Sequence, residues 1–159
     1  MCAYVREGVL FSELLNPMVE RFRDLRVYRD AFRAARRIYE LSTNWPKVER
    51  YALTDQIRRS SRAVNANVAE AWRKRLYPKH FVSKLSDADA EAAETRSWLD
   101  FALDHGYLPQ NTYDELDDRY DKIQASLVKM MDTPDRWCGP ADQVREDHTD
   151  YFTSGPFPN

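Results

Sequence analysis

Arginine side chains are the residues of this sequence best suited to bind another molecule. At about 100° per residue of helix, five of them fall within a single arc of one segment: Arg26, Arg29, Arg33, Arg36 and Arg37. A second group lies on one side of a later segment and comprises Arg58, Arg59, Arg62 and Arg73. Each guanidinium presents a planar fork of N–H donors that matches the oxygens of phosphates and carboxylates. The pattern predicts a surface that follows phosphate groups with little readout of bases.

The positive charge continues beyond the second segment through Lys74 and Arg75. The candidate nucleic-acid-binding residues are therefore Arg26, Arg33, Arg37, Arg58, Arg59, Arg62, Arg73, Lys74 and Arg75. No aromatic side chain is interleaved with this basic arc, so we expect no platform on which unpaired bases stack. The alternative is an ordinary charged helix face, or arginines that pair with the acidic half of a neighbouring subunit.

The charge of the chain is divided between its halves. The whole chain carries −2, but residues 23–84 hold 16 Lys and Arg against 6 Asp and Glu, and residues 85–135 hold 4 against 13. Such a division predicts one of two contacts. The basic half can bind a polyanion such as RNA or DNA, or it can pair with the acidic half of a second copy.

Residue types that carry catalysis or hold metals are not arranged for either role. None of the histidines follows a Glu or Asp by three residues, as the ligands of a di-metal helix bundle require; they are His80, His105 and His148. Ser60 and Ser61 fall on an apolar helix stripe without a histidine partner, and the glycine-rich phosphate-binding motifs are missing. We therefore expect no enzyme activity, no catalytic residue, no cofactor and no metal site.

Four amphipathic segments are predicted to position the arginines as helices. They cover residues 24–43, a segment from Glu49 or Leu53 to Arg75, residues 79–104, and a segment that begins after Pro109 and ends before Pro134. The apolar stripe of the first segment is Tyr28, Ala31, Phe32, Ala35, Ile38 and Tyr39. The stripe of the second is Leu53, Ile57, Ser60, Ser61, Val64, Val68, Ala71 and Trp72.

The third and fourth segments carry seams with the alternating spacing of nearly aligned helix pairs. The third seam is Phe81, Leu85, Ala88, Ala92, Thr95, Leu99 and Ala102, and the fourth is Tyr113, Leu116, Tyr120, Ile123, Leu127 and Met130. Gly106 follows the third segment, where a helix C-cap favours positive φ. Long helices joined by short turns must pack antiparallel, so the predicted fold class is all-α, an antiparallel up-down four-helix bundle.

The bundle is predicted to span residues 23–134 as one domain. Residues 1–22 form an N-terminal extension, and residues 135–159 form a C-terminal tail that is flexible or packs on a neighbour. Cys2 and Cys138 lie in the end segments without a Cys-x-x-Cys pair, the start lacks a signal peptide, and no apolar run is long enough to cross a membrane. These features predict a cytoplasmic protein with no membrane partner.

Several separated motifs resemble one bacterial family of four-helix bundles. The most telling motif is Gln56-Ile57-Arg58-Arg59-Ser60-Ser61 followed by Val64-Asn65-Ala66-Asn67-Val68-Ala69-Glu70-Ala71-Trp72. The flanking motifs are Leu25-Arg26-Val27-Tyr28, Trp45-Pro46, Glu49-Arg50-Tyr51-Ala52-Leu53-Thr54, Trp98-Leu99 and Gly106-Tyr107-Leu108. In this order they resemble proteins encoded in intervening sequences of large-subunit ribosomal RNA genes. That family also includes the accessory variability determinant of diversity-generating retroelements.

The resemblance implies a homopentamer whose bundles ring a central channel. In the retroelement relatives the channel is basic, binds nucleic acid and works beside a reverse transcriptase. Carried onto this chain, the matching motif makes Arg58, Arg59 and Arg62 the leading binding residues, and Arg73 to Arg75 follow them.

The sequence departs from the common family pattern in two places, which leaves the subgroup's function open. Glu70-Ala71 stands where the family often has Glu-Gly, and Ala90-Glu91 stands where it often has Gly-Ser. We expect a non-enzymatic, homo-oligomeric accessory protein that binds RNA or DNA, with a reverse transcriptase as a further partner. The alternative is a structural or protein-interaction module whose basic and acidic faces mediate self-assembly.

Overall fold

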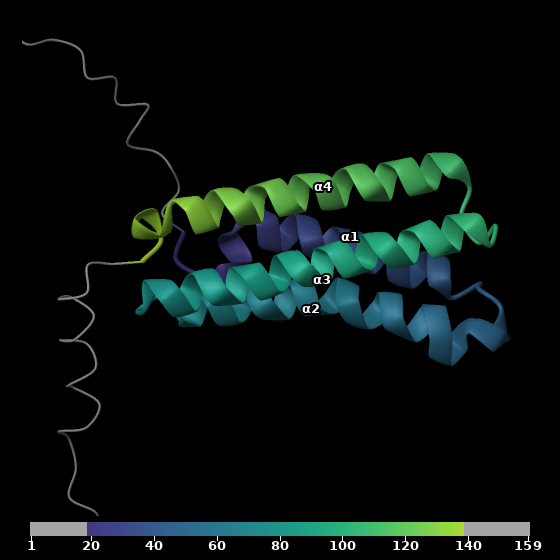
Figure 1. Cartoon of the computed structure of the whole chain (residues 1–159), viewed down its shortest axis with the longest axis horizontal. Coiled ribbons are helices and arrows are strands. Elements are labelled where there is room, and N and C mark those ends of the chain that lie inside the picture. The colour runs from purple at the N-terminus through teal and green to yellow at the C-terminus, as the bar shows by residue number, and fades with distance from the viewer. Residues whose placement is uncertain (1–18, 139–159) are drawn as a thin grey trace, which may run out of the picture.

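Four antiparallel helices make up most of residues 19–138, the part of the chain that the computed structural model describes. They are α1 (Arg26–Ser42), α2 (Asp55–Arg73), α3 (Pro78–Asp104) and α4 (Gln110–Asp132). Short helical turns flank them: η1 (Phe22–Asp24), η2 (Lys47–Glu49), η3 (Arg50–Thr54) and η4 (Pro134–Arg136). Each long helix runs opposite to the one before it (Figure 1), and the described residues contain no strand. The predicted all-α, antiparallel four-helix bundle is confirmed.

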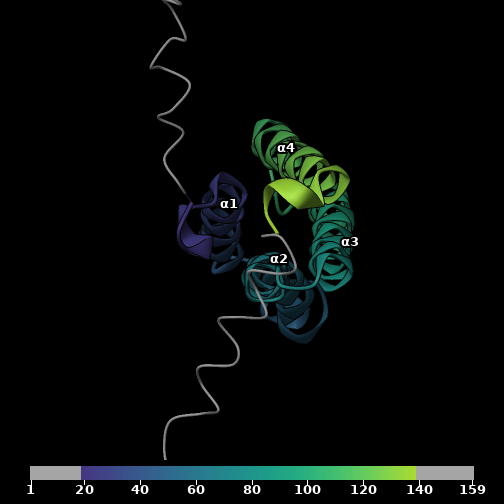
Figure 2. The ribbon, with the colours of Figure 1, turned by 90° about the vertical axis from the view of Figure 1, so that its left-hand side faces the viewer.

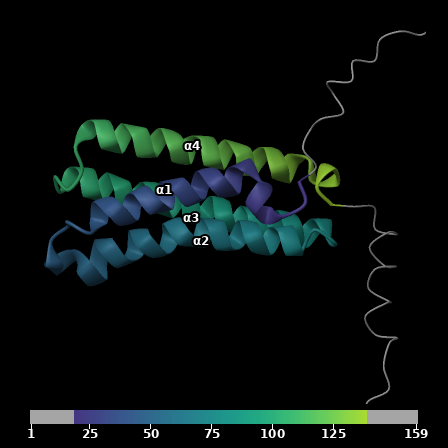
Figure 3. The same cartoon turned by 180° about the vertical axis from the view of Figure 1, so that it is seen from behind.

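The helices stand at the corners of a square in chain order. Viewed along the bundle, α1 and α2 form one side, and α3 and α4 form the opposite side (Figure 2). Seen from behind, α1 lies between α2 and α4 (Figure 3), and it contacts both of them. The basic and acidic halves of the sequence therefore form two different sides of one molecule.

Apolar side chains at alternating spacing fill the core from α3 and α4. Every predicted seam residue of α3, from Phe81 to Ala102, is fully buried. Five of the six predicted residues of α4 are buried, and Tyr113 is half-buried. The small seam residues Ala88 and Ala92 let α2 come close, and α2 makes the widest contact with α3. The apolar pattern of these two helices was predicted correctly.

The predicted apolar stripe of α1 is wrong in part. The helix buries Val27, Ala31, Ala34, Ile38 and Ser42. Two members of the predicted stripe, Phe32 and Tyr39, are instead 56% and 46% exposed. The helix is turned so that small side chains face the bundle, because a close approach to two neighbouring helices leaves no room for rings at these positions.

The start of α2 differs from its predicted position. The segment expected to begin the helix at Glu49 or Leu53 forms the short helical turn η2 and the five-residue π-helix η3, which runs directly into α2, so regular α-helix begins at Asp55. The Glu49 side chain caps η3 by accepting a hydrogen bond from the backbone N–H of Leu53 (3.4 Å). At the other end α2 stops at Arg73, so Lys74 and Arg75 lie in the turn before Pro78, not in the helix.

The turn after α3 has the predicted C-cap geometry. Gly106 has a φ of 74°, in the left-handed region that favours glycine. Its N–H donates to Leu103 O (2.9 Å), and the N–H of Tyr107 donates to Ala102 O (2.8 Å), which satisfies carbonyls at the helix end. Pro109 then begins α4 from an extended conformation.

Residues just outside the long helices also pack on the core. Val19 and Phe22 do so before α1, and Trp137 and Cys138 do so after α4. Burial raises the pKa of the Cys138 thiol. The rest of the predicted extension and tail, with Cys2 and His148, lies outside the described residues.

Candidate nucleic-acid interface

Two of the predicted arginines converge on one aromatic ring across the contact between α1 and α2. The guanidinium carbon of Arg58 lies 4.8 Å from the centre of the Tyr39 ring, and that of Arg62 lies 5.7 Å from it. A cation at this range over an exposed π-face is attracted by about 0.5–1 kcal/mol. The ring therefore joins both charges of α2 to the surface of α1.

Arg58 has a second role that Arg62 lacks. Its Nε donates to Ser42 Oγ at 2.8 Å, and Ser42 is buried at the end of α1. The Arg58 side chain is half-buried. Arg62 is exposed and forms no ion pair with another described residue. Arg62 is therefore the freer of the two to bind a phosphate.

A hollow of about 350 Å³ lies beside these arginines, between α1 and α2. Its lining residues are Tyr28, Phe32, Ala35, Arg36, Tyr39, Arg62 and Asn65. The expectation that no aromatic ring lies among the arginines is therefore wrong. It assumed that Phe32 and Tyr39 fill the core, but the orientation of α1 brings both rings to the surface.

Arg59 lies at the other edge of the outer face of α2, toward α3. The pKa of Glu91 on α3 is raised by burial and then by the charge of Glu94, and the positive charge of Arg59 opposes that rise. Arg59 is exposed. The three predicted arginines of this motif thus form a basic band across α2, with one edge at α1 and the other at α3.

The predicted arginines of α1 are exposed and pair with acids of their own helix. Arg26 lies 3.5 Å from Asp30, Arg33 lies 3.7 Å from the same carboxylate, and Arg37 lies 3.9 Å from Glu40. Exposed pairs of this kind contribute about 0–1 kcal/mol, so phosphates can replace them readily. Arg26 also lines a hollow against α4, so it faces away from the basic band of α2.

The end of α2 carries the remaining predicted residues. Arg73 and Lys74 are exposed. Arg75 folds back instead, because its guanidinium lies 4.1 Å from the centre of the Trp72 ring and its Nη1 donates to Trp72 O at 2.8 Å. Partial burial, followed by the charge of Arg73, lowers the pKa of Arg75. Arg75 therefore stabilises the turn, and Arg73 and Lys74 are the cations available to a ligand.

Sequence reasoning missed two ring side chains at the start of α3, one just before the helix and one in its first turn. Tyr77 is 60% exposed, and its ring centre lies 5.6 Å from that of His80. The exposed Lys79 lies between them in the sequence. Tyr77 is the N-cap residue of α3, directly before Pro78, so no preceding turn of the helix covers its ring. The Tyr-Pro pair at the start of a predicted helix was the signal in the sequence that this ring is exposed.

The side of the bundle formed by α3 and α4 is acidic, and its central arginine is bound by carboxylates of the same side. Arg96 of α3 holds Asp117 of α4 with a two-pronged contact (2.7 and 3.1 Å) and also donates to Asp121 (3.2 Å). The hydrogen bond to Asp117 raises the pKa of Arg96. This fork clamps α3 to α4, so the side formed by these helices presents mainly carboxylates.

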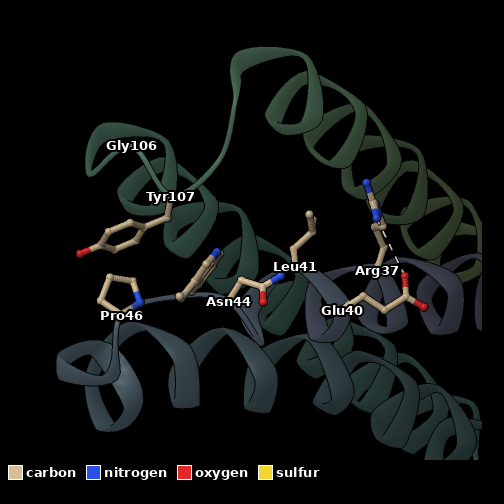
Figure 4. Close-up of a pocket in the computed structure, with 8 residues that line it drawn as sticks. Arg37, Glu40, Leu41, Asn44, Pro46, Gly106 and Tyr107 are labelled. Atoms are coloured by element: carbon tan, nitrogen blue, oxygen red, sulfur yellow. Dashed lines mark ion pairs between the residues drawn. The ribbon is translucent and has the colours of Figure 1, made fainter.

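Another hollow, of about 520 Å³, lies at the end of the bundle where the connection between α1 and α2 meets the turn between α3 and α4 (Figure 4). Arg37 and Glu40 on its rim form an ion pair. The Tyr107 hydroxyl points away from that pair in Figure 4 and donates to Glu49 at 3.1 Å. The charged side chains that line this hollow are one arginine and one glutamate, so the hollow presents no net charge that would select an anion or a cation.

Ser60 and Ser61 take part in helix packing. The buried hydroxyls of Ser60 and Thr95 lie 2.8 Å apart between α2 and α3, and Ser61 Oγ donates to Arg58 O of its own helix (3.3 Å). Among residues 19–138, no group of three or more His, Cys, Asp or Glu could hold a metal ion. Every helix in that part of the chain is too short or too polar to span a bilayer.

The fold and this surface define a class of protein: an all-helical bundle whose first two helices carry a basic outer face. The chain belongs to the 23S rRNA-intervening sequence protein family, whose model matches residues 23–129. The resemblance inferred from the sequence motifs is thereby confirmed.

A solved structure agrees with this assignment. The chain is similar to a protein of unknown function from the S23 ribosomal protein family of Bacteroides thetaiotaomicron, with 26% identity and a TM-score of 0.59. The similarity covers 66% of this chain and 97% of that one. No curated protein matches the chain.

Proposed function

We propose that this chain is a non-enzymatic, homo-oligomeric protein that binds nucleic acid through the outer face of α1 and α2. The observation that carries the proposal is the basic band of Arg58, Arg59 and Arg62, which Arg36 of α1 extends across the helix contact. Phosphates are the partners that such guanidinium groups suit best, and their neutralisation supplies most of the affinity of sequence-independent binding. The family description refers to an intervening sequence of 23S rRNA and names no ligand, so structured RNA and duplex DNA are both candidates.

The division of charge between the two sides supports this orientation. A polyanion is attracted to the side formed by α1 and α2 and is repelled by the acidic side formed by α3 and α4. Four arginines of α1 form ion pairs, all with acids of the same helix, so a phosphate competes with weak contacts. The nucleic acid therefore meets one defined face of the bundle.

The proposal also includes self-association, through contacts that leave the basic band of α2 free for nucleic acid. Heterologous contacts between copies close into a ring when the rotation allows it. The family resemblance suggests five copies. The proposal includes no reverse transcriptase, because the described residues offer nothing specific to such an enzyme.

Charge reversal at two exposed positions tests the nucleic-acid site. We expect Arg59→Glu/Arg62→Glu to weaken binding of a labelled structured RNA by at least tenfold in fluorescence anisotropy at low salt. The variant should reduce the slope of log affinity against log salt by about 2, because each phosphate contact contributes roughly one unit. Arg58 is left intact because its bond to Ser42 stabilises the fold.

The matched control carries the same charge change on the acidic side. Arg119→Glu/Lys129→Glu alters two exposed cations of α4, and we expect it to keep more than half of the affinity. Light scattering reports the oligomer mass of each protein. Loss of affinity in the control to the same extent, or no binding by the wild type to RNA or duplex DNA at low salt, would contradict the proposal.

The separation of charge also favours a second candidate, a protein-interaction module that assembles through its own basic and acidic sides. This candidate predicts an oligomer that falls apart as salt is raised and that has no affinity for nucleic acid. It also predicts that Arg59→Glu/Arg62→Glu lowers the oligomer mass. An oligomer that keeps its mass in high salt while it releases RNA would rule this candidate out.

A further inference from the structure

Two aromatic rings of α1 are exposed where the basic face begins. Phe32 is 56% exposed and Tyr39 is 46% exposed. Tyr28 stacks against Phe32 with ring centres 6.4 Å apart and an angle of 22° between the rings. The rings lie on one side of α1, since Tyr28 and Phe32 are separated by four residues and Phe32 and Tyr39 by seven. They form a row along the helix in which Phe32 and Tyr39 are exposed, and the guanidinium groups of Arg58 and Arg62 lie over the Tyr39 ring.

The row of rings lies between two hollows lined by arginines. The hollow between α1 and α2, of about 350 Å³, contains Arg36 and Arg62. A neighbouring hollow of about 370 Å³ contains Arg23, Arg29 and Arg33. Both hollows share Tyr28 and Phe32, so they meet at these rings. Together their linings hold five arginines and no Asp or Glu.

One unpaired polar atom lies among the lining residues. Asn65 is only 8% exposed, and its Nδ2 donates to Tyr28 O at 2.8 Å. Its Oδ1 is buried and has no hydrogen-bond partner among the described residues. Buried acceptors normally find a donor, but this oxygen has almost no exposed surface, so the groups that a ligand can contact in the hollow are the rings and the arginines.

We propose that the two hollows form one groove that binds an unpaired segment of RNA or DNA, with bases stacked on Phe32 and Tyr39 and phosphates held by the surrounding arginines. This inference rests on the proposed function and names the form of nucleic acid that the basic face prefers. Stacking platforms for single strands combine a positive groove with open aromatic faces, and both features meet here.

The positive charge of the groove favours a single strand of RNA or DNA over an apolar helix of another protein. An apolar helix laid on the rings would cover five guanidinium groups, of which only Arg33 and Arg36 have an acidic partner, so it would leave buried positive charge without compensation. A single strand supplies both a base to each ring and a phosphate to the arginines. A duplex keeps its bases stacked within the helix, so it can use the arginines but not the rings.

Comparison of a single strand with a duplex tests the groove. We expect the wild type to bind a 20-nucleotide mixed-sequence RNA at least tenfold more tightly than the duplex of the same length, at one fixed salt concentration. Stacking of one base is worth about fivefold to more than a hundredfold in affinity. Phe32→Leu/Tyr39→Leu keeps apolar side chains but removes both rings, so it should abolish this preference and leave duplex binding unchanged.

Two controls separate stacking from general effects. Tyr51 is 83% exposed on η3, outside the groove, and Tyr51→Leu should bind both probes as the wild type does. An abasic strand of the same length has the phosphates but no bases. The wild type should bind this strand no more tightly than Phe32→Leu/Tyr39→Leu does. Circular dichroism should show the same helix content in all variants, because the altered residues are exposed.

The possible outcomes distinguish this inference from the proposed function. If Phe32→Leu/Tyr39→Leu binds the single strand like the wild type while Arg59→Glu/Arg62→Glu loses both probes, the groove is not a stacking site but the basic face still binds nucleic acid. A fall in oligomer mass of Phe32→Leu/Tyr39→Leu would show that a second copy covers the rings, and would overturn the inference. If the wild type binds neither probe, both proposals fail.

Discussion

Neighbouring arginines of the same motif do different work in this protein. Arg58 donates to the buried Ser42 and lies half-buried over Tyr39, while Arg62 lies exposed over the same ring. A hydrogen bond from a charged group contributes more to stability than an exposed charge does. Residue type and spacing made the two equivalent, and only the contact with the end of α1 separates them.

Because of this difference, we expect alanine at position 58 to lower stability and alanine at position 62 to lower RNA affinity. Arg58→Ala should lower the free energy of unfolding by about 1–2 kcal/mol, because it removes a charge-assisted hydrogen bond at the end of α1. Arg62→Ala should change it by less than about 0.5 kcal/mol, as exposed substitutions usually do, yet weaken RNA binding. Urea unfolding measures the first effect and anisotropy the second. Equal stability of the two variants would contradict the assignment.

The Tyr120 hydroxyl is a polar group buried at a cost. The side chain is fully buried in the core, and among the described residues its hydroxyl forms no hydrogen bond of good geometry, although it lies close enough to the Thr95 hydroxyl for that group to oppose the rise in its pKa. Burial raises the pKa of Tyr120. A buried hydroxyl without a partner costs about 1–3 kcal/mol, so Tyr120→Phe should raise the free energy of unfolding by about 1 kcal/mol in urea. A loss of stability in this variant would show that the hydroxyl has a partner in solution.

Glu91 should make stability depend on pH. Burial, and then the charge of Glu94, raise its pKa above the ordinary value of 4.5. In the window just above that value the folded protein holds more protons than the unfolded chain, so stability falls as pH rises through it. Glu91→Gln should therefore have a higher Tm than the wild type near pH 7, and the difference should shrink toward pH 4. A difference that stays constant with pH would contradict this cause.

At the scale of the helix, the sequence predicted some packing faces and misplaced others. The seam of α3 has one apolar stripe of core residues, so its buried face could be predicted from spacing alone. Helix α1 has two candidate stripes, an aromatic one through Phe32 and Tyr39 and a small one through Ala31 and Ala34. The predicted stripe combined Ala31 and Ile38, which are buried, with Phe32 and Tyr39, which are exposed. The buried face is centred on Ala31, Ala34 and Ile38, so it is rotated away from the two rings.

The same misplacement explains why the candidate site was only half predicted. The arginines were recognised because charged groups lie on the surface whichever apolar stripe is chosen. The groove was missed because it depends on which side of α1 is buried and on how α1 lies against α2. A helix wheel of α1 alone shows neither which of its sides is buried nor how the helix lies against α2.

The turn after α3 carries a further prediction at this scale. Gly106 has a φ of 74°, and a Cβ added there would meet no atom within 4 Å. Substitution should therefore cost only backbone strain, about 1–2 kcal/mol for Gly106→Ala. Gly106→Asn should cost less, because asparagine tolerates the left-handed region. Urea unfolding compares the two variants, and equal losses would contradict a backbone origin of the strain.

At the scale of the whole molecule, helices that follow one another in the chain lie side by side, so the basic and acidic halves of the sequence form two separate sides of the bundle. The first two helices are basic and form one side, and the last two are acidic and form the other (Figure 2). A bundle with a different helix order would have mixed the two signs around its surface. The side of α1 and α2 is therefore the face that an RNA or DNA strand should approach.

Photo-cross-linking locates this face most directly. The protein is irradiated with RNA that carries 4-thiouridine, and the cross-linked peptides are identified by mass spectrometry. We expect cross-links to residues 26–42 of α1 and to residues 55–75 of α2 and its following turn, and these products should be lost as salt is raised. Cross-links confined to α3 and α4, or none above the level given by an unrelated acidic protein, would contradict it.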